Sequence, residues 1–231
     1  MLRVLCASLA LASAVVLAAP SAAQPPATEI ATCPDGTGGR WSASRVQRGD
    51  AVVLALVHTG IDGARGAALD VRRADAARGV TAQLRGDGRG GAWLAWTELD
   101  YFAMTTEVRA AHVGAGGVVL SSGEAALASF ADLFDAVSLL PDGQGGAYVA
   151  WREADARHER ALRLARLTAQ GRPASGWPAS GLTVAERQGN VRPRLVTDGE
   201  GGAIVVADSD PNRAGGEPFA QRVSPAAALL R

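Results

Sequence analysis

The chain has 231 residues and a formal net charge of zero at pH 7, with 23 basic residues, all of them arginine, against 23 acidic ones. Because the two signs are interspersed and form no basic stripe, the composition argues against nucleic acid or an anionic membrane as a partner. The absence of lysine excludes a phosphate-binding P-loop lysine, a Schiff-base lysine and a Ser-Lys catalytic dyad.

Residues 1–23 have the pattern of a secretory signal peptide. A positive charge at Arg3 precedes an apolar run over residues 4–19, and small residues lead up to Ala23. The run is short for a membrane-spanning helix and ends at Pro20, and no later segment is long and apolar enough to cross a bilayer. We therefore expect cleavage after Ala23 and a secreted or periplasmic protein without a membrane span.

Cysteine usage leaves one thiol in the mature chain. Cys6 is lost with the signal peptide, so Cys33 stands alone in an oxidising compartment. It is either a half-buried thiol near the mature N-terminus or a partner for a cysteine of another chain. No His or Cys lies near it in sequence to suggest a metal site or a catalytic pair.

The phrase Asp-Gly-x-Gly-Gly is repeated along the chain. It begins at Asp87, Asp142 and Asp198, at a spacing of about 55 residues. Glycine supplies the positive φ angles of a tight hairpin, and Asp tolerates such positions while it bonds its own backbone. An alternating run that is apolar on both faces follows each copy, at residues 92–96, 147–151 and 203–207. Each copy therefore predicts a hairpin that leads into a strand packed between neighbouring sheets.

A second phrase recurs about 24 residues after each of these aspartates and predicts a third strand. Arg166 and Arg222 occupy matching places in it, and His112 falls there if one residue of slack is allowed. A fourth short strand is expected at residues 182–185. Four short strands in a repeat of this length are typical of a β-propeller blade.

The two ends of the repeat region are less regular. Asp35 starts another copy of the turn phrase, but no apolar strand follows it directly, so we assign the first hairpin to Gly49-Asp50 and the earlier copy to an extra turn. The sequence thus predicts an N-terminal segment at 24–45 and an all-β, propeller-like repeat domain at 46–231. This domain has about four short-stranded blades, of which the first and the last are incomplete.

Whether these blades close into a ring, form an open arc or are a truncated piece of a larger propeller stays open. Exposed edges at incomplete blades need a partner strand. We predict that residues 27–32 pair with a strand near residues 219–223. In residues 121–136, which contain good helix formers, we expect at most a turn.

The repeat Asp-Gly-x-Gly-Gly-Ala-x-Val-Ala-Trp, followed by a strand such as Ala-Gln-Arg-Val-Ser, resembles repeats of uncharacterised secreted bacterial β-propeller proteins. The resemblance covers roughly residues 46–225 and implies a propeller fold. It does not indicate an activity, because such propellers bind, scaffold and catalyse. The sialidase Asp-box and the kelch repeat fit the spacing poorly.

Candidate chemistry is sparse. The three histidines, His58, His112 and His158, have no metal-ligand spacing, and no His-Glu-x-x-His or Gly-x-Ser-x-Gly phrase occurs. We therefore assign no catalytic residue, no metal site and no cofactor. Trp96 and Trp151 recur at equivalent strand positions, which favours a place in the core between blades.

The loops between the second and third strands are acidic, and a propeller would gather them on one rim. One of them carries Glu98, Asp100, Tyr101 and Glu107. Acidic loops on one rim suit a ligand site or the carboxylate pair of a glycosidase, although exposed hairpin loops are often simply charged. As ligand-binding residues the sequence suggests Asp100, Tyr101, Asp155, Asp208 and Asp210.

The sequence favours an exported repeat protein that acts as a binding or scaffolding module for an unidentified ligand or protein partner, without catalysis of its own. One alternative is a glycan-processing hydrolase of the propeller type, in which Asp100 or Asp155 would be needed for turnover. The other alternative is a truncated fragment of a larger propeller.

Overall fold

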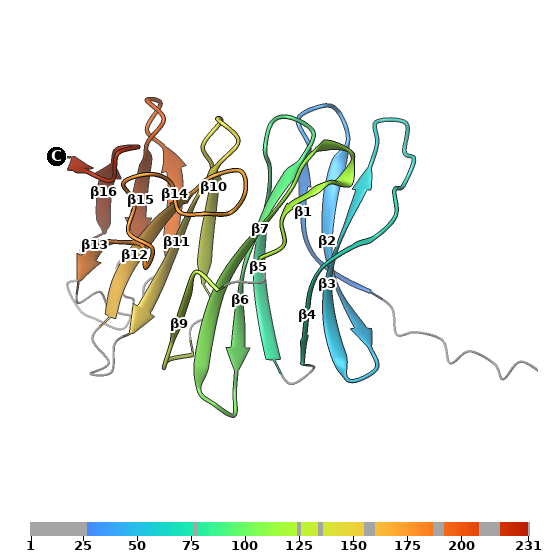
Figure 1. Cartoon of the computed structure of the whole chain (residues 1–231), viewed down its shortest axis with the longest axis horizontal. Coiled ribbons are helices and arrows are strands. Elements are labelled where there is room, and N and C mark those ends of the chain that lie inside the picture. The colour runs from blue at the N-terminus through green and yellow to red at the C-terminus, as the bar shows by residue number, and fades with distance from the viewer. Residues whose placement is uncertain are drawn as a thin grey trace, which may run out of the picture.

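The computed structural model describes residues 27–75, 78–123, 126–133, 136–154, 160–186, 192–207 and 218–230. These residues form four antiparallel sheets that follow one another along the chain, and Figure 1 shows them side by side. We call each sheet a blade. The all-β, propeller-like fold predicted from the sequence is confirmed.

Within each blade the strands are hydrogen-bonded in chain order. The first blade contains β1 (Thr28–Pro34), β2 (Arg40–Arg48), β3 (Ala51–Thr59) and β4 (Leu69–Asp75). The second blade contains β5 (Arg78–Gly86), β6 (Ala92–Asp100), β7 (Thr105–Val113) and β8 (Val119–Ser121), with β9 (Ala128–Phe130) paired to β7 and a short 3-10 turn, η1, at Ala115–Gly117.

The third blade contains β10 (Val137–Pro141), β11 (Ala147–Ala154), β12 (Arg160–Leu167) and β13 (Leu182–Glu186). The fourth contains β14 (Pro193–Thr197), β15 (Ala203–Ala207), β16 (Phe219–Val223) and β17 (Leu229–Leu230). Successive blades meet through their first strands, since β5 contacts both β1 and β10, and β10 contacts β14.

An Asp-Gly-x-Gly-Gly loop joins the first strand to the second in all four blades, and this corrects the assignment of the first hairpin. The copy at Asp35 joins β1 to β2, whereas Gly49 and Asp50 form the turn between β2 and β3. The strand after Asp35 was missed because it reads Arg-Trp-Ser-Ala-Ser, in which every second residue is polar. Fourth strands are present in both end blades, as β4 and β17.

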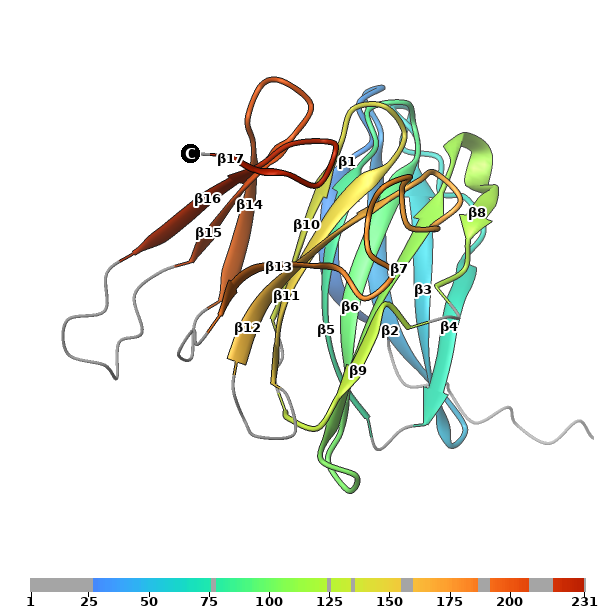
Figure 2. The ribbon, with the colours of Figure 1, turned by 60° about the vertical axis from the view of Figure 1, so that its left-hand side comes forward.

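The predicted pairing of residues 27–32 with the last blade is wrong. Strand β1 pairs with β2, with Thr32 opposite Ser42, and the partners of β16 are β15 and β17. Figures 1 and 2 show the first and fourth blades at opposite ends of a fan. The described strands therefore form an open propeller-like arc.

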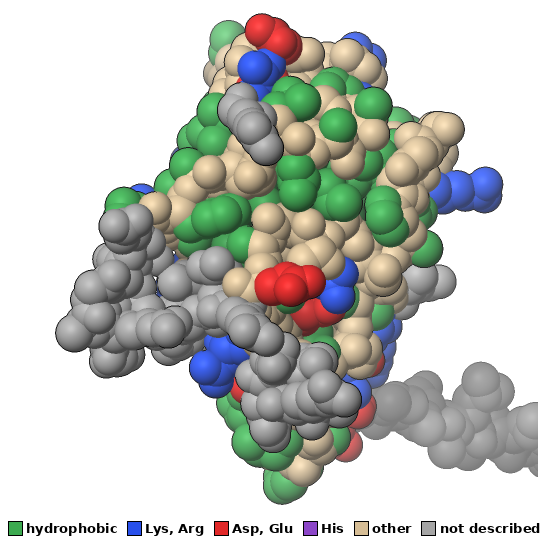
Figure 3. Space-filling view, turned by 90° about the vertical axis from the view of Figure 1, so that its left-hand side faces the viewer, with side chains coloured by type: hydrophobic (Ala, Val, Ile, Leu, Met, Phe, Trp, Pro, Cys, Tyr) green, Lys and Arg blue, Asp and Glu red, His purple; other side chains and the backbone are tan. Residues whose placement is uncertain are grey.

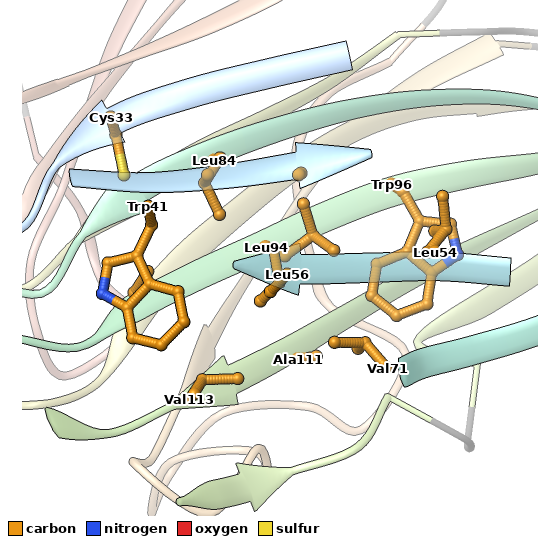
Figure 4. Packing of buried hydrophobic residues seen from close by; sticks show 12 residues of the cluster. Cys33, Trp41, Leu54, Leu56, Val71, Leu84, Leu94, Trp96, Ala111 and Val113 are labelled. Atoms are coloured by element: carbon orange, nitrogen blue, oxygen red, sulfur yellow. The ribbon is translucent and has the colours of Figure 1, made fainter. Parts of the chain in front are cut away.

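The core consists of three clusters, one at each interface between blades. The first contains Trp41, Leu56, Leu94 and Trp96, and Figure 4 shows the two indole rings at its ends with the leucines between them. The second cluster, between the second and third blades, is built around Trp93 and Trp151. The third cluster, between the third and fourth blades, is built around Tyr148, Leu164 and Trp177. Burial of large aromatic side chains dominates the energetics of such interfaces, and the prediction that Trp96 and Trp151 lie between blades is confirmed.

Cys33 lies in the first cluster, where its side chain is buried rather than half-buried as predicted. At the other end of the molecule, the fourth blade turns Ile204 and Val206 away from the third blade, and both remain partly exposed. Figure 3 looks at this end, and hydrophobic side chains cover much of the visible surface. No helix in the described ranges is long and apolar enough to cross a membrane.

Candidate active site between the first two blades

The repeated aspartates are structural. In each Asp-Gly-x-Gly-Gly loop, one carboxylate oxygen accepts hydrogen bonds from the backbone N–H groups two and four residues further on, at 2.7–2.9 Å. The other oxygen binds a side chain on the third strand of the same blade. These partnerships are Asp35 with His58 (2.7 Å), Asp87 with His112 (3.1 Å), Asp142 with Arg166 (2.9 Å) and Asp198 with Arg222 (2.9 Å).

The hydrogen bonds favour the carboxylate form of two of these aspartates, Asp35 and Asp198. A hydrogen bond from His58 and the N–H of Thr37 lower the pKa of Asp35 far below its usual value. The N–H of Glu200 and the guanidinium of Arg222 lower the pKa of Asp198 despite partial desolvation. With both oxygens of each carboxylate hydrogen-bonded within its own blade, the loop aspartates close the hairpins.

A second constellation recurs in the two middle blades and combines Trp-x-Glu with an arginine on the third strand. In the second blade Trp96 Nε1 donates to Glu98 Oε1 at 2.9 Å, and Arg109 Nε lies 3.3 Å from the same oxygen. In the third blade Trp151, Glu153 and Arg163 repeat the arrangement, with Arg163 Nε donating to Glu153 at 2.6 Å. Because the arrangement is repeated, we infer that Glu98 and Glu153 have a structural role: each joins the second strand of its blade to the third.

Three carboxylates converge on the guanidinium of Arg78, the first residue of β5. Its Nη1 lies 3.3 Å from both Glu98 Oε2 and Glu107 Oε2, and its Nη2 lies 3.6 Å from Asp100 Oδ2. The Glu98 side chain is fully buried, whereas those of Asp100 and Glu107 are 25% and 24% exposed. We call Arg78 with Asp100 and Glu107 the carboxylate cluster.

Glu98 anchors this cluster to the first blade. Arg72, on β4, binds it through Nε at 2.8 Å and Nη2 at 3.2 Å. Burial on its own would raise the pKa of Glu98, but hydrogen bonds from Arg72 and Trp96 and the nearby positive charges lower it below its ordinary value. A buried carboxylate needs such complete pairing, so Glu98 holds Arg72 and Arg78 in place.

A cleft of about 320 Å³ opens beside the cluster at the boundary of the first two blades. Its walls are made by Ala51, Arg72, Arg73, Ala74, Asp75 and Arg78. Arg78 therefore faces the cleft and also carries the carboxylates. The β6–β7 turn lies on the same side, because Arg78 is paired with Asp100 across the β5–β6 ladder.

The structure tests the suggested ligand-binding residues only in part. Asp100 and Tyr101 lie together at the β6–β7 turn, where Asp100 Oδ1 accepts hydrogen bonds from the N–H groups of Phe102 and Ala103. The hydrogen bond from Ala103 contributes most to lowering the pKa of Asp100, against partial desolvation. Tyr101 is 55% exposed. The remaining three, Asp155, Asp208 and Asp210, lie outside the described residues.

Sequence reasoning missed Arg72 and Arg78, which bring the acidic residues together. Neither lies in a recognisable motif, and Arg72 is 26 residues from the glutamate that it binds. Within the described ranges, no group of three or more His, Cys, Asp or Glu side chains is arranged to hold a metal ion.

No family model matches the chain, and no curated protein matches it. Similar solved structures include a Hadza microbial sialidase (9% identity, TM-score 0.49), an α-L-arabinofuranosidase from Fusarium graminearum (11%, 0.47) and a GH43_1 enzyme from Xanthomonas citri (12%, 0.45). The matches cover 87%, 84% and 88% of this chain, but 44%, 61% and 72% of those chains. The chain thus spans about half the length of the first two structures.

This comparison corrects the functional prediction. The sequence favoured a binding or scaffolding module without catalysis. That prediction is contradicted, because the solved structures with a similar architecture are named as glycoside-acting enzymes. The likeness concerns the architecture alone, so no residue role is carried over from those enzymes.

Proposed function

We propose that the chain is a glycan-processing hydrolase, or the part of one that carries reacting carboxylates, and that the sugar binds at the cleft between the first two blades. The observation that carries the proposal is the carboxylate cluster: Asp100 and Glu107 bind opposite nitrogens of one guanidinium, that of Arg78. Glycoside hydrolysis uses two carboxyl groups about 5 to 9.5 Å apart on either side of the scissile bond. Sharing one guanidinium holds two carboxylates at a separation of this scale.

The environment of each residue suggests its part in the reaction. Glu107 also accepts a hydrogen bond of 2.7 Å from Arg109 Nη2, which fixes the position of its carboxyl group, and a fixed carboxylate suits a nucleophile or a general base. Asp100 is held as a carboxylate by the turn, and it can accept hydrogen bonds from sugar hydroxyl groups.

We propose Tyr101, which follows Asp100 in the β6–β7 turn, as a further contact residue. Its side chain is 55% exposed, and a Cβ on Gly79 would meet its hydroxyl and ring. An amphipathic ring with a polar tip offers both an apolar face and a hydroxyl to a sugar. Glycine at position 79 keeps room for it.

A panel of chromogenic glycosides tests the proposal on the mature chain. We expect turnover by the unmodified protein and at least a hundredfold lower kcat in Glu107→Gln and Asp100→Asn, the scale of loss of a general acid–base group. Glu200→Gln, a change at an exposed glutamate in the fourth blade, is the control that leaves kcat unchanged. Absence of turnover across the panel, or turnover that survives both changes, contradicts the proposal.

We also propose that the protein is exported after cleavage behind Ala23 and belongs with the secreted bacterial propeller proteins whose repeats it resembles. The support is the pattern of residues 1–23 together with the repeated turn phrase. Expression in a bacterial host followed by N-terminal sequencing should find Gln24 as the first residue of the exported protein. An intact Met1 on the purified protein would contradict export by this route.

A further inference from the structure

Both ring nitrogens of His112 are bonded to acceptors. Nε2 lies 3.1 Å from Asp87 Oδ2, and Nδ1 lies 2.9 Å from the backbone carbonyl oxygen of Ala169. The side chain is only 3% exposed, and its ring stacks on that of Trp93 with the centroids 4.3 Å apart. A carbonyl oxygen and an ionised carboxylate can only accept hydrogen bonds. Both contacts can form together only if each ring nitrogen carries a proton, so this arrangement requires the imidazolium form.

The same position in the next blade is occupied by a permanent cation. Arg166 binds Asp142 in its own blade and also donates to the carbonyl oxygen of Pro225 in the following blade, at 3.4 Å. Pro225 and Ala169 are equivalent, because each lies two residues after the end of the third strand in its blade. The two side chains therefore form the same bridge from a loop aspartate to the carbonyl of the next blade.

We propose that His112 is a protonation-dependent clasp between the second and third blades. The imidazolium ring joins the Asp87 loop to the loop that carries Ala169. A neutral ring has one N–H, so either the carboxylate or the carbonyl then faces a lone pair in a buried site, which is unfavourable. The inference is independent of the proposed glycosidase activity.

The direction of the pH effect follows from proton linkage. A histidine in an unfolded chain loses its proton near about pH 6.5, whereas the clasped form binds one more proton than a neutral ring. Because the clasp requires this additional proton, low pH favours the clasp and high pH weakens it. The affected loop borders a cleft of about 410 Å³ lined in part by Ser121, Gln170 and Arg172.

The charged groups around the ring do not replace the clasp. Among the described residues, Asp87 is the one carboxylate within ion-pair distance of His112. The other charged side chains on the packed elements are Arg85 on β5, Arg89 in the Asp87 loop, and Asp142 and Arg172 on loops of the third blade. Arg89 donates to the carbonyl of Gly143, and Asp142 binds Arg166.

His58 in the first blade is a matched control. Its Nε2 contacts Asp35 Oδ2 at 2.7 Å, and its side chain is 34% exposed. A neutral ring with the proton on Nε2 keeps that hydrogen bond, so a change of protonation there does not break a bridge between blades.

Two measurements test the clasp on the mature chain. Nitrogen-15 NMR of the histidine rings should show both nitrogens of His112 protonated at about pH 6. Hydrogen exchange of the amides of Thr168, Gly171 and Ala174, corrected for its intrinsic pH dependence, should speed up about tenfold between pH 6 and pH 8.5, the factor expected for one lost hydrogen bond. These amides bond within the Ala169 loop and to the strand before it.

The variant His112→Arg installs the permanent cation of the next blade and should abolish the pH dependence of that exchange. His58→Arg should leave the pH dependence unchanged. A neutral His112 ring near pH 6, or a pH dependence that persists in His112→Arg, overturns the proposal. If His112→Arg fails to fold, the NMR measurement on the unmodified protein decides alone.

Discussion

The hydroxyl of Tyr148, on β11, donates a hydrogen bond of 2.8 Å to the carbonyl oxygen of Gly201 in the turn loop of the next blade. Trp41 makes the equivalent bond two interfaces earlier, between the first and second blades, from Nε1 to the carbonyl of Gly90 at 3.0 Å. In both cases the second residue of the second strand reaches the fourth residue of the following Asp-Gly-x-Gly-Gly loop. The repeated loop thus closes its own hairpin and also accepts a hydrogen bond from a side chain of the preceding blade.

Tyr148→Phe should lower the free energy of unfolding by about 1 kcal/mol, because the change removes the donor and leaves the carbonyl of Gly201 without its partner. Equilibrium denaturation in urea measures the effect. Tyr101→Phe is the control, since the Tyr101 side chain is exposed and its loss should change stability by less than about 0.5 kcal/mol. Equal effects of the two changes would refute the role of the bond.

Gly181→Ala should destabilise the third blade more than Gly176→Ala does. Both glycines have a positive φ, +78° and +81°, which is strained for alanine. A Cβ on Gly181 would also lie 2.7 Å from Cη2 of Trp151, whereas a Cβ on Gly176 has nothing within 4 Å. The difference between the two unfolding free energies should be about 1 to 3 kcal/mol, the usual cost of overpacking. A difference near zero would mean that the Trp151 ring can move.

Acid should weaken the fourth blade through Asp198. Its pKa is lowered in the folded protein, mainly by the N–H of Glu200 and by Arg222. The stabilisation is therefore present above about pH 4, the range of an unfolded aspartate, and is lost as the pH falls through the lower folded value. Melting temperatures measured from about pH 5 downwards should fall more steeply for the unmodified protein than for Asp198→Asn. Parallel curves would exclude this contribution.

Cys33 should resist thiol reagents in the folded protein. Burial raises the pKa of its thiol to about 11, against the opposing charge of Arg85, so little thiolate exists near neutral pH. Labelling with a chromogenic disulfide reagent at about pH 8 should be slow in the native chain and fast after denaturation. Rapid native labelling, or a disulfide-linked dimer on a non-reducing gel, would contradict the buried position.

The turns and the blade pattern follow from local chemistry, and the sequence determined them. Glycines at the second and fourth places of each loop adopt positive φ, and the loop aspartate accepts hydrogen bonds from residues within four positions. Such contacts depend only on neighbouring residues. The copy at Asp35 was misassigned because its strand has polar residues at alternate positions, and an apolar run was the criterion for a strand.

The order of pairing and the carboxylate cluster were decided only by the tertiary structure. Nothing near Arg72 or Arg78 in the sequence indicates that they meet Glu98. Arg72 reaches it from the fourth strand of the neighbouring blade, and Arg78 reaches it from β5, the strand paired with β6. The proton requirement of His112 likewise depends on Ala169, which is 57 residues further along the chain. Hydrogen bonds and ion pairs between blades join residues that are far apart in sequence, so local secondary-structure propensity and motif spacing cannot predict them.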